Sequence, residues 1–315
     1  MPFCELQATL AGQGQMIALD PPFSTTATIG GVIASNSSGP MRHRFGTARD
    51  LVIGMTFVTL EGKLVKTGGM VVKNVAGLDM AKLMIGSFGT LAAIATLNFR
   101  VHSLPPETRT FLFSFSDLES AMDKRNLIVK SFLQPMSLDL ISPPAATRFG
   151  ARGYLLAVRA GGTRQVIERY SRELSGSEQL RDAPETAFWN TAREFSPDFL
   201  RRHPGGVVLR VSTPLSDLGP LLKLFSGASI SRAGSGVSYL HVTSWQGCAA
   251  IWTAALARPW SVVVEFAPDE IRAARDLWIR RATPAQKNTF AIMEKVKHMF
   301  DPQRLLNRSR LYGHI

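Results

Sequence analysis

Residues 28–39 are the first part of the sequence where the backbone, rather than side chains, could contact a ligand. The segment reads TIGGVIASNSSG, with adjacent Gly30 and Gly31 followed by small and polar residues. Glycine lacks a Cβ atom, so a ligand can lie close to the backbone and accept hydrogen bonds from its N–H groups. Arg42 and Arg44 follow and could face a diphosphate. This combination would suit a flat, anionic ligand.

A second stretch of small residues lies at 86–90 and includes Gly86, Gly89 and Thr90. Two such stretches in one domain would suit a long ligand that crosses the backbone. The alternative is that these glycines serve tight turns and a bulge, and composition alone favours that simpler interpretation.

The residue patterns of several well-known catalytic sites are absent from the sequence. It contains no G-x-x-x-x-G-K-[ST] phosphate loop, no H-E-x-x-H zinc motif and no G-x-S-x-G nucleophile elbow. None of the six histidines has a second one four residues away, so the spacing supports no metal site. No histidine or carboxylate stands in a context that identifies a general base, and no catalytic residue is assigned.

Composition indicates a globular protein with a basic surface. The 315 residues are 45% hydrophobic, and the formal net charge is +12 at pH 7. Such a charge favours anionic partners, but there is no basic tail or aromatic-interleaved basic strand, so nucleic acid is not an expected partner. No apolar run reaches the ~18–20 residues of a membrane span, and the N-terminus lacks the basic region of a signal peptide. We therefore expect a cytoplasmic protein.

The first third of the chain shows local signals for short elements. We predict a helix over residues 5–13 and a glycine-rich, strand-like region from residue 28 to about residue 101. Within this region a hairpin should turn at Glu61-Gly62, and Asp79 should cap a short helix over residues 80–85. The Pro-containing segment 102–110 is the best candidate for a linker.

After this linker, short strands alternate with amphipathic helices. A Ser116-x-x-Glu119 capping box should open the first helix. The expected strands are MSLDLI, YLLAVRA, VVLRVST, SYLHVTS and SVVVEFA, and the expected helices cover residues 164–174, 185–195, 215–225, 245–257 and 268–281. This alternation predicts an α+β domain with helices on one face of a sheet. A final helix should begin near Pro284, followed by a Pro-containing tail.

Three segments in order resemble one known family. TIGGVIASNSSG resembles the second flavin-contacting segment of the FAD-linked oxidases of the vanillyl-alcohol oxidase type. RFGTARDLVIGMTFVTLEGKLVKTGG and KNVAGLDMAKLMIGSFGTLAAI are similar to later parts of the same PCMH-type FAD-binding domain. Together with the tail FDPQRLLNRSR, they are most similar to the FAD-binding subunits of bacterial glycolate oxidases. The resemblance is specific over residues 21–106 and 299–310, and between them only the order of strands and helices agrees.

The resemblance implies an α+β fold with two domains and FAD as the cofactor. Residues 1–105 would be a PCMH-type two-lobed FAD-binding domain, N-terminally incomplete, and residues 106–315 an α+β cap domain whose C-terminal tail returns to the flavin site. The positions that match flavin-contacting positions of the family are Thr28, Ile29, Gly30, Gly31, Ser35, Asn36, Gly39, Asp50, Val52, Gly86, Gly89, Thr90, Ile94, Asn307 and Arg310.

The sequence departs from the family pattern at two places. The family's tail usually reads N-P-G-R, where this chain has Asn307-Arg308-Ser309-Arg310. No G-x-G-T loop, which holds the pyrophosphate in the family, precedes Thr28. A start placed too late, a truncated gene or a partner that completes the site would each explain this, and we expect weak FAD binding by the chain alone.

The resemblance also implies an activity and partners. The chain would oxidise 2-hydroxy acids, glycolate to glyoxylate first, as one subunit of a complex. Its partners would be other glycolate oxidase subunits, namely a second flavoprotein subunit and an iron–sulfur subunit. Through this complex it could be peripheral at the inner face of the membrane. The alternatives are a structural subunit that binds no flavin and, on charge alone, a basic nucleic-acid-binding protein.

Overall fold

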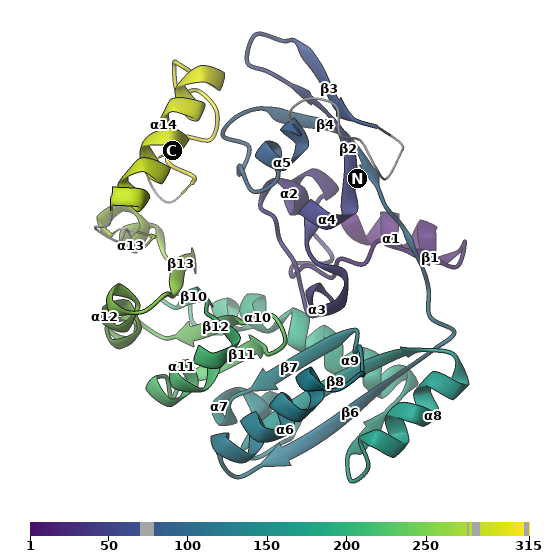
Figure 1. Ribbon diagram of the computed structural model, residues 1–315. Helices are drawn as coiled ribbons and strands as arrows, with labels where there is room; N and C mark the ends of the chain where they lie inside the picture. Colours follow the sequence, from purple (N-terminus) through teal and green to yellow (C-terminus); the bar gives the residue numbers. More distant parts are fainter. Residues whose placement is uncertain (70–78, 276, 279–283, 312–314) are drawn as a thin grey trace. The chain divides into compact units, whose positions relative to one another are not determined.

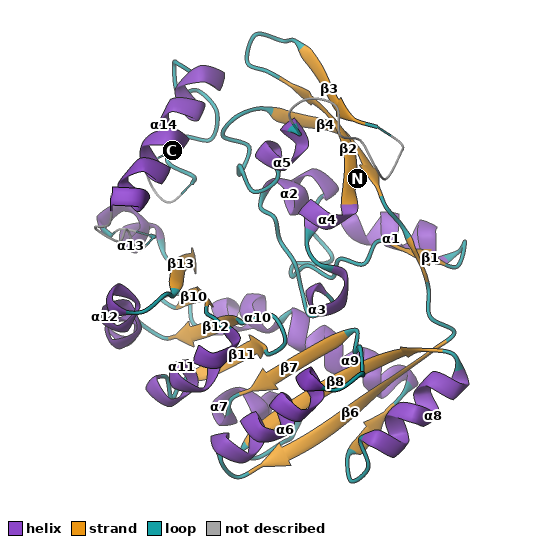
Figure 2. Ribbon diagram, viewed as in Figure 1, coloured by secondary structure: helices purple, strands orange, loops and turns teal. Residues whose placement is uncertain are grey.

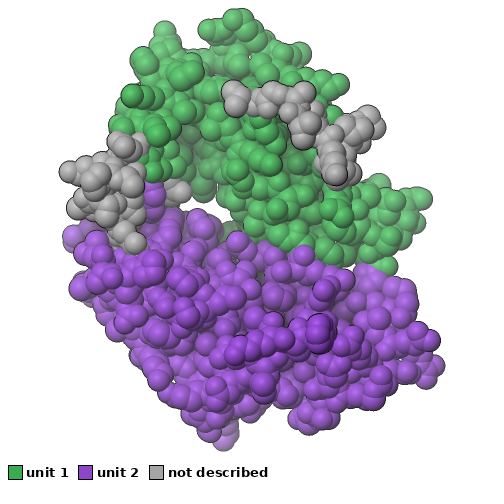
Figure 3. Space-filling model, viewed as in Figure 1, with its two compact units in different colours: residues 1–39, 45–104, 280–315 green, residues 40–44, 105–279 purple. Residues whose placement is uncertain are grey.

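The structure is a computed structural model that describes residues 1–69, 79–275, 277–278, 284–311 and 315. The start of the KNVAGLDM motif and the end of the helix expected at 268–281 lie outside these residues. The chain forms two compact units (Figure 3). Unit 1 comprises residues 1–39, 45–104 and 280–315, and unit 2 comprises residues 40–44 and 105–279. The assignment of separate functions to the two units stays a prediction.

Unit 1 contains two small antiparallel sheets and several short helices (Figure 1). β1 (Gln15–Met16) pairs with β5 (His102–Ser103), and β2 (Val52–Val58) pairs with both β3 (Leu64–Gly68) and β4 (Ala93–Phe99). The β2–β3 pair confirms the hairpin expected at Glu61-Gly62. The helices are α1 (Phe3–Ala11), α2 (Ile29–Ala34), α3 (Arg42–Phe45), α4 (Ala48–Leu51), α5 (Met80–Met84) and α14 (Pro284–Phe300), α3 lying across the boundary with unit 2.

Two helix starts in unit 1 follow from local capping. The carboxylate of Asp79 accepts a hydrogen bond from the Lys82 amide at 3.3 Å, which confirms the predicted cap of α5. The hydroxyl of Thr28 accepts one from the Gly31 amide at 3.1 Å and so begins α2. The strand-like interpretation of residues 29–34 is therefore wrong, because the Thr28 cap and the burial of Val32 and Ile33 together offset the low helix propensity of two glycines.

Unit 2 is built on an eight-stranded antiparallel sheet with the order β13-β10-β12-β11-β7-β8-β6-β9 (Figure 2). Its strands are β6 (Glu107–Phe115), β7 (Ser137–Ile141), β8 (Tyr154–Gly162), β9 (Glu178–Leu180), β10 (Val207–Ser212), β11 (Ala228–Arg232), β12 (Val237–Val242) and β13 (Ser261–Phe266). Its helices are α6 (Leu118–Lys130), α7 (Pro143–Ala146), α8 (Arg164–Glu173), α9 (Asp182–Arg193), α10 (Phe195–Arg202), α11 (Leu218–Leu224), α12 (Ala249–Ala257) and α13 (Asp269–Ala274). Short 3-10 turns cover Thr147–Phe149, Leu215–Asp217 and Trp245–Cys248.

Helices cover both faces of this sheet, which corrects the expectation of one covered face. On β7, Leu140 packs into a core with α6, α8 and α11, whereas the next residue, Ile141, packs into a separate core with α7, α9 and α10. Successive residues of a strand point to opposite faces. Both faces of β7 and β8 are therefore buried; the nearly continuous apolar run of β8 indicates this, whereas β7 also buries Ser137 and Asp139.

One cap in unit 2 also differs from the expectation. Asp117, not Ser116, caps α6, because its carboxylate accepts a hydrogen bond from the Ser120 amide at 2.8 Å. The capping box expected at Ser116 and Glu119 is therefore wrong, and the cap lies one residue later, at Asp117.

A histidine is buried in the core of unit 2. The His241 ring is 4% exposed, with ring centroids 4.8 Å from Phe195 and 5.1 Å from Phe199. Its Nδ1 lies 3.2 Å from the Ala228 carbonyl oxygen and its Nε2 lies 2.9 Å from the Ser196 hydroxyl. A carbonyl can only accept, so Nδ1–H donates to it and Nε2 accepts from Ser196. Burial lowers the pKa of His241 to about 3.

This low pKa should make the protein sensitive to mild acid. Below pH 6.5 the unfolded chain binds a proton at this histidine and the folded chain does not, so stability falls as pH falls. Between pH 7 and pH 5 the loss should be about 2 kcal/mol. Urea unfolding at both pH values should show this difference between the parent protein and His241→Gln. An equal pH dependence in both proteins would contradict the buried neutral state.

An ion pair is buried on the same sheet. The Arg232 guanidinium on β11 bonds to the Asp139 carboxylate on β7, and these side chains are 5% and 0% exposed. Burial raises the pKa of Asp139 to about 6, although the Arg232 charge opposes the shift. Asp139 Oδ1 and Arg232 Nε have no hydrogen-bond partner among the described residues. The two charges therefore neutralise each other, but removing both from water costs free energy.

Candidate functional site

Unit 1 contains a hollow of ≈ 490 Å³ where three of its segments meet. These are helix α2, the segment from the 88–92 loop into β4, and the C-terminal tail at 306–310. The hollow is lined by Gly30, Gly31, Ala34, Ser35, Phe88, Gly89, Ala92, Ala93, Ile94, Leu306, Asn307 and Arg310. Seven of the sequence-predicted site residues therefore lie together.

Helix α2 gives the hollow a smooth wall. Gly30, Gly31, Ala34 and Ser35 are spaced so that they share one side of a helix, and none has a side chain longer than a hydroxymethyl group. A Cβ atom added at Gly30 would meet no atom within 4 Å, whereas one at Gly31 would lie 3.1 Å from the Thr28 hydroxyl. Gly30 thus faces open space, and a flat molecule could lie against the backbone there.

A second part of the lining is formed by Gly89 and the C-terminal tail, which are in contact. Gly89 has φ +67°, and a Cβ atom there would lie 2.8 Å from the side-chain nitrogen of Asn307. The same Asn307 nitrogen donates a hydrogen bond to the Phe88 carbonyl at 2.7 Å. Gly89 is required both by its left-handed backbone and by this close approach.

A buried ion pair fixes the tail. The Lys297 ammonium, 2% exposed, donates to Asp301 Oδ2 at 2.6 Å, to the Thr90 carbonyl at 2.7 Å and to the Leu306 carbonyl at 2.9 Å. Asp301, 0% exposed, also accepts from the amides of Leu305 at 2.9 Å and Leu306 at 2.7 Å. This network connects the helix α14, the loop at 86–92 and the residues just before Asn307.

Four of the remaining predicted residues lie outside the lining and make hydrogen bonds that hold its segments in place. Thr28 caps α2, and the Ile29 amide donates to the Met1 carbonyl at 3.2 Å. The Gly86 amide donates to the Ile33 carbonyl at 3.2 Å, and Thr90, 0% exposed, donates its hydroxyl to the Ser87 carbonyl at 2.7 Å.

The other four occupy turns or strand ends. Asn36 has φ +50°, and its buried side-chain oxygen has no hydrogen-bond partner among the described residues. A Cβ atom at Gly39 would collide with Asp20. Asp50 accepts a hydrogen bond from the Thr47 amide at 2.8 Å, and Val52 begins β2.

Similarity to known proteins agrees with this geometry. A model of the FAD-binding domain family matches residues 1–68. The glycolate oxidase subunit GlcE of Escherichia coli strain K12 is 31% identical over 244 residues, which are 77% of this chain and 63% of that protein. The chain resembles the FAD-linked oxidase family, and its residues 1–68 match the FAD-binding domain. This confirms the family resemblance and FAD as the cofactor of the domain.

A second relative and a solved structure are similar to nearly the whole chain. The glycolate oxidase subunit GlcD of Bacillus subtilis strain 168 is 25% identical over 336 residues, 93% of this chain and 70% of that protein. A solved structure of alkyldihydroxyacetonephosphate synthase superposes with a TM-score of 0.68 at 16% identity, over 98% of this chain and 62% of that one. The second likeness confirms the expected fold class. The chain spans less than two thirds of the length of GlcE.

The residues of the hollow fit FAD. The bare backbone at Gly30 leaves room for a flat ring or a phosphate. Arg310 is exposed and is the cation of the lining, so it can face a diphosphate. The site therefore has the flat apolar wall and the positive charge that a flavin nucleotide needs.

Among its described residues, the lining offers no group for proton transfer near neutral pH. Arg310 is its ionisable side chain, and an arginine stays protonated. In the described part of the chain no group of three or more histidine, cysteine or carboxylate side chains could hold a metal ion. Nor does that part contain a helix long and apolar enough to cross a membrane.

The sequence did not indicate every residue of the site. Phe88 and Leu306 line the hollow, and Lys297 and Asp301 fix the tail. The i, i+4 spacing of Lys297 and Asp301 is an ordinary surface pattern, and only the contact with the distant Thr90 makes it part of the site.

Proposed function

We propose that this chain is the FAD-binding subunit of a complex that oxidises 2-hydroxy acids, with glycolate, converted to glyoxylate, as the first substrate. The observation that carries this proposal is the hollow of unit 1, which Gly30, Gly89 and Arg310 line and where a Cβ atom at Gly30 would meet no atom within 4 Å. The similarity to two proteins named as glycolate oxidase subunits supports the choice of substrate class.

Each wall of the hollow would have its own part in holding the cofactor. The face of α2 would contact it through Gly30, Gly31 and Ser35, and Arg310 would pair with the diphosphate. Ile94 would pack against an apolar part of the nucleotide. When bound, FAD supplies the oxidising chemistry by accepting two electrons from the substrate.

The proposed partners are a second flavoprotein subunit and an iron–sulfur subunit. Support comes from the relatives, which are themselves named as subunits. A complex of this kind would place the general base on another chain, consistent with a hollow that lacks one. The proposed location is the cytoplasm or, through the complex, the inner face of the membrane.

Replacing Gly30 with leucine should abolish most FAD binding. The leucine side chain would occupy the open space in front of α2, and overpacking of this kind costs about 1–3 kcal/mol. FAD affinity should therefore fall roughly 5- to 150-fold. Helix propensity favours leucine over glycine, so α2 should not unfold. Titration with FAD, followed by flavin fluorescence, measures the change.

Gly205→Leu is the matched control. A Cβ atom at Gly205 also meets no atom within 4 Å, but this glycine lies in unit 2, outside the lining of the hollow. It should bind FAD like the parent protein. If Gly30→Leu also keeps the parent affinity, the hollow is not the flavin site. If neither the parent protein nor the variants bind FAD, the chain is a structural subunit instead.

The substrate class needs a separate measurement. Glycolate added without oxygen to the FAD-loaded complex should bleach the flavin absorbance near 450 nm, because reduction removes the visible band. D-lactate tests whether other 2-hydroxy acids are substrates. Succinate, which lacks a 2-hydroxy group, is the negative control. Bleaching by neither 2-hydroxy acid would refute the proposed substrate and leave FAD binding intact.

A further inference from the structure

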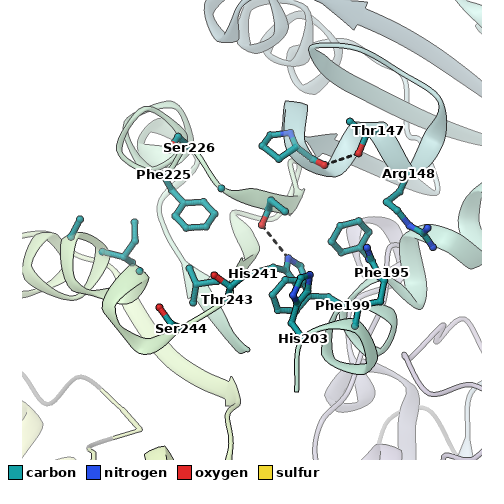
Figure 4. A pocket seen from close by; sticks show the side chains of 18 of the residues that line it. Thr147, Arg148, Phe195, Phe199, His203, Phe225, Ser226, His241, Thr243 and Ser244 are labelled. Carbon is teal, nitrogen blue, oxygen red and sulfur yellow. Dashed lines mark hydrogen bonds between the residues drawn. The ribbon is translucent and has the colours of Figure 1, made fainter. Parts of the chain in front are cut away.

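Unit 2 contains a cavity of ≈ 540 Å³ that the proposed function does not use (Figure 4). It lies where β11 begins and β12 ends, between α10 and α12. The buried rings of Phe195, Phe199 and Phe225 form part of its lining. Figure 4 shows the Phe225 ring on one side and the rings of Phe195, Phe199 and His241 on the other. The cavity therefore contains a cluster of aromatic rings.

His241 makes one wall of this cavity rigid and uncharged. Its two ring nitrogens bond to the Ala228 carbonyl and the Ser196 hydroxyl, so the ring cannot turn without breaking both contacts. It adds a flat face beside Phe195 and Phe199 and contributes no positive charge. An occupant in contact with this wall is selected by shape and apolar surface.

The charge of the cavity comes from its mouth. Among the described residues of its lining are the guanidinium groups of Arg148 and Arg202 but no carboxylate. Asp198, outside the lining, pairs with Arg148 at 3.5 Å, and its carbonyl accepts from Arg202 Nε at 3.2 Å. The two terminal nitrogens of Arg202 bond to no other described residue. Exposed hydroxyls of Thr243 and Ser244 complete the mouth.

We propose that this cavity binds a small aryl carboxylate, with its ring against Phe199, Phe225 and His241 and its carboxylate on Arg202. A planar guanidinium matches a carboxylate through two parallel hydrogen bonds. A bare phosphate would leave the aromatic rings in contact with water, and a neutral arene would leave Arg202 unpaired. The site lies entirely within unit 2 and does not depend on the proposed flavin chemistry.

Titration of the full chain with 2-naphthoate tests the proposal. This probe carries an aromatic ring and one carboxylate, and 2-naphthalenemethanol is its neutral counterpart. Naphthoate should bind at least about tenfold more tightly than the alcohol, because only the anion forms charge-assisted hydrogen bonds. Calorimetry gives both affinities. Equal affinities would overturn the proposed anion site.

Two matched pairs of variants place the binding in the cavity. Arg202→Gln should lower the affinity for 2-naphthoate at least about tenfold. Arg201→Gln removes the same charge from an exposed neighbour outside the lining and should leave the affinity unchanged. Ala250→Phe should block the cavity, whereas Ala249→Phe, one residue earlier on α12 and equally exposed, should not. Unchanged binding in Ala250→Phe would overturn the location.

Discussion

Lys297→Met should release the C-terminal tail and lower the free energy of unfolding of unit 1 by about 3–5 kcal/mol at neutral pH. The substitution leaves the Asp301 carboxylate buried without its counter-ion and removes the bonds to the Thr90 and Leu306 carbonyls. Asn307 would lose its fixed position over Gly89, so FAD affinity should fall too. Hydrogen exchange of the amides of Leu305 and Leu306 measures the release directly.

The control for this prediction is Lys295→Met. Lys295 lies on the same helix but is exposed. The tail of this variant should exchange like that of the parent protein, and equal exchange in both variants would show that the buried pair does not hold the tail. In the parent protein, burial alone would raise the pKa of Asp301, but hydrogen bonds from Lys297 and two amides lower it to about 2. The contribution of this carboxylate is therefore complete above about pH 4 and lost as pH falls through 2.

Arg232→Met should destabilise unit 2 by about 3–5 kcal/mol at pH 8, because Asp139 would remain as an isolated buried charge. The pKa of Asp139 is already raised to about 6 with the arginine present, and it should rise further without it. Protonation then neutralises the carboxylate, so the deficit should shrink as pH falls below that raised pKa. Urea unfolding of parent and variant at pH 8 and pH 5 measures both effects.

The double variant Asp139→Asn, Arg232→Met separates the pair from the individual residues. Removing both charges leaves no buried ion, and stability at pH 8 should recover most of what the single variant lost. A double variant as unstable as Arg232→Met would mean that the packing of the Arg232 side chain, rather than the charge left on Asp139, explains the loss.

Local signals in the sequence predicted local structure well. Glu61-Gly62 predicted the turn between β2 and β3, and Asp79 predicted the start of α5, because each signal acts within about four residues. The two glycines of α2 contradicted its helix, and the Thr28 cap was the signal that could have indicated it. The small residues that line the hollow of unit 1 were recognised through the family resemblance, since composition alone favoured turns.

The parts that were missed depend on contacts far apart in the sequence. β11 is a central strand, yet its Ser229 and Ser231 are fully buried polar residues that do not resemble a strand core. Ser231 is accommodated because its hydroxyl bonds to that of Ser238 on β12 at 2.8 Å. The alternation of Leu140 and Ile141 between two cores likewise needs both sets of helices in place. No single segment contains this information.

The contact between Lys297 and Thr90 also has a consequence for synthesis on the ribosome. These residues are 207 positions apart, and residues 105–279 of unit 2 lie between them in the chain. At ~5–20 residues per second, the ribosome needs roughly 10–40 s to make that stretch. Throughout this interval the loop that contains Gly89 has been synthesised but Asn307 has not, while nearly all of unit 2 becomes available to fold. The hollow of unit 1 is thus completed only after unit 2 has been made, so any ligand that needs both Gly89 and Asn307 can bind only late in the biogenesis of the protein.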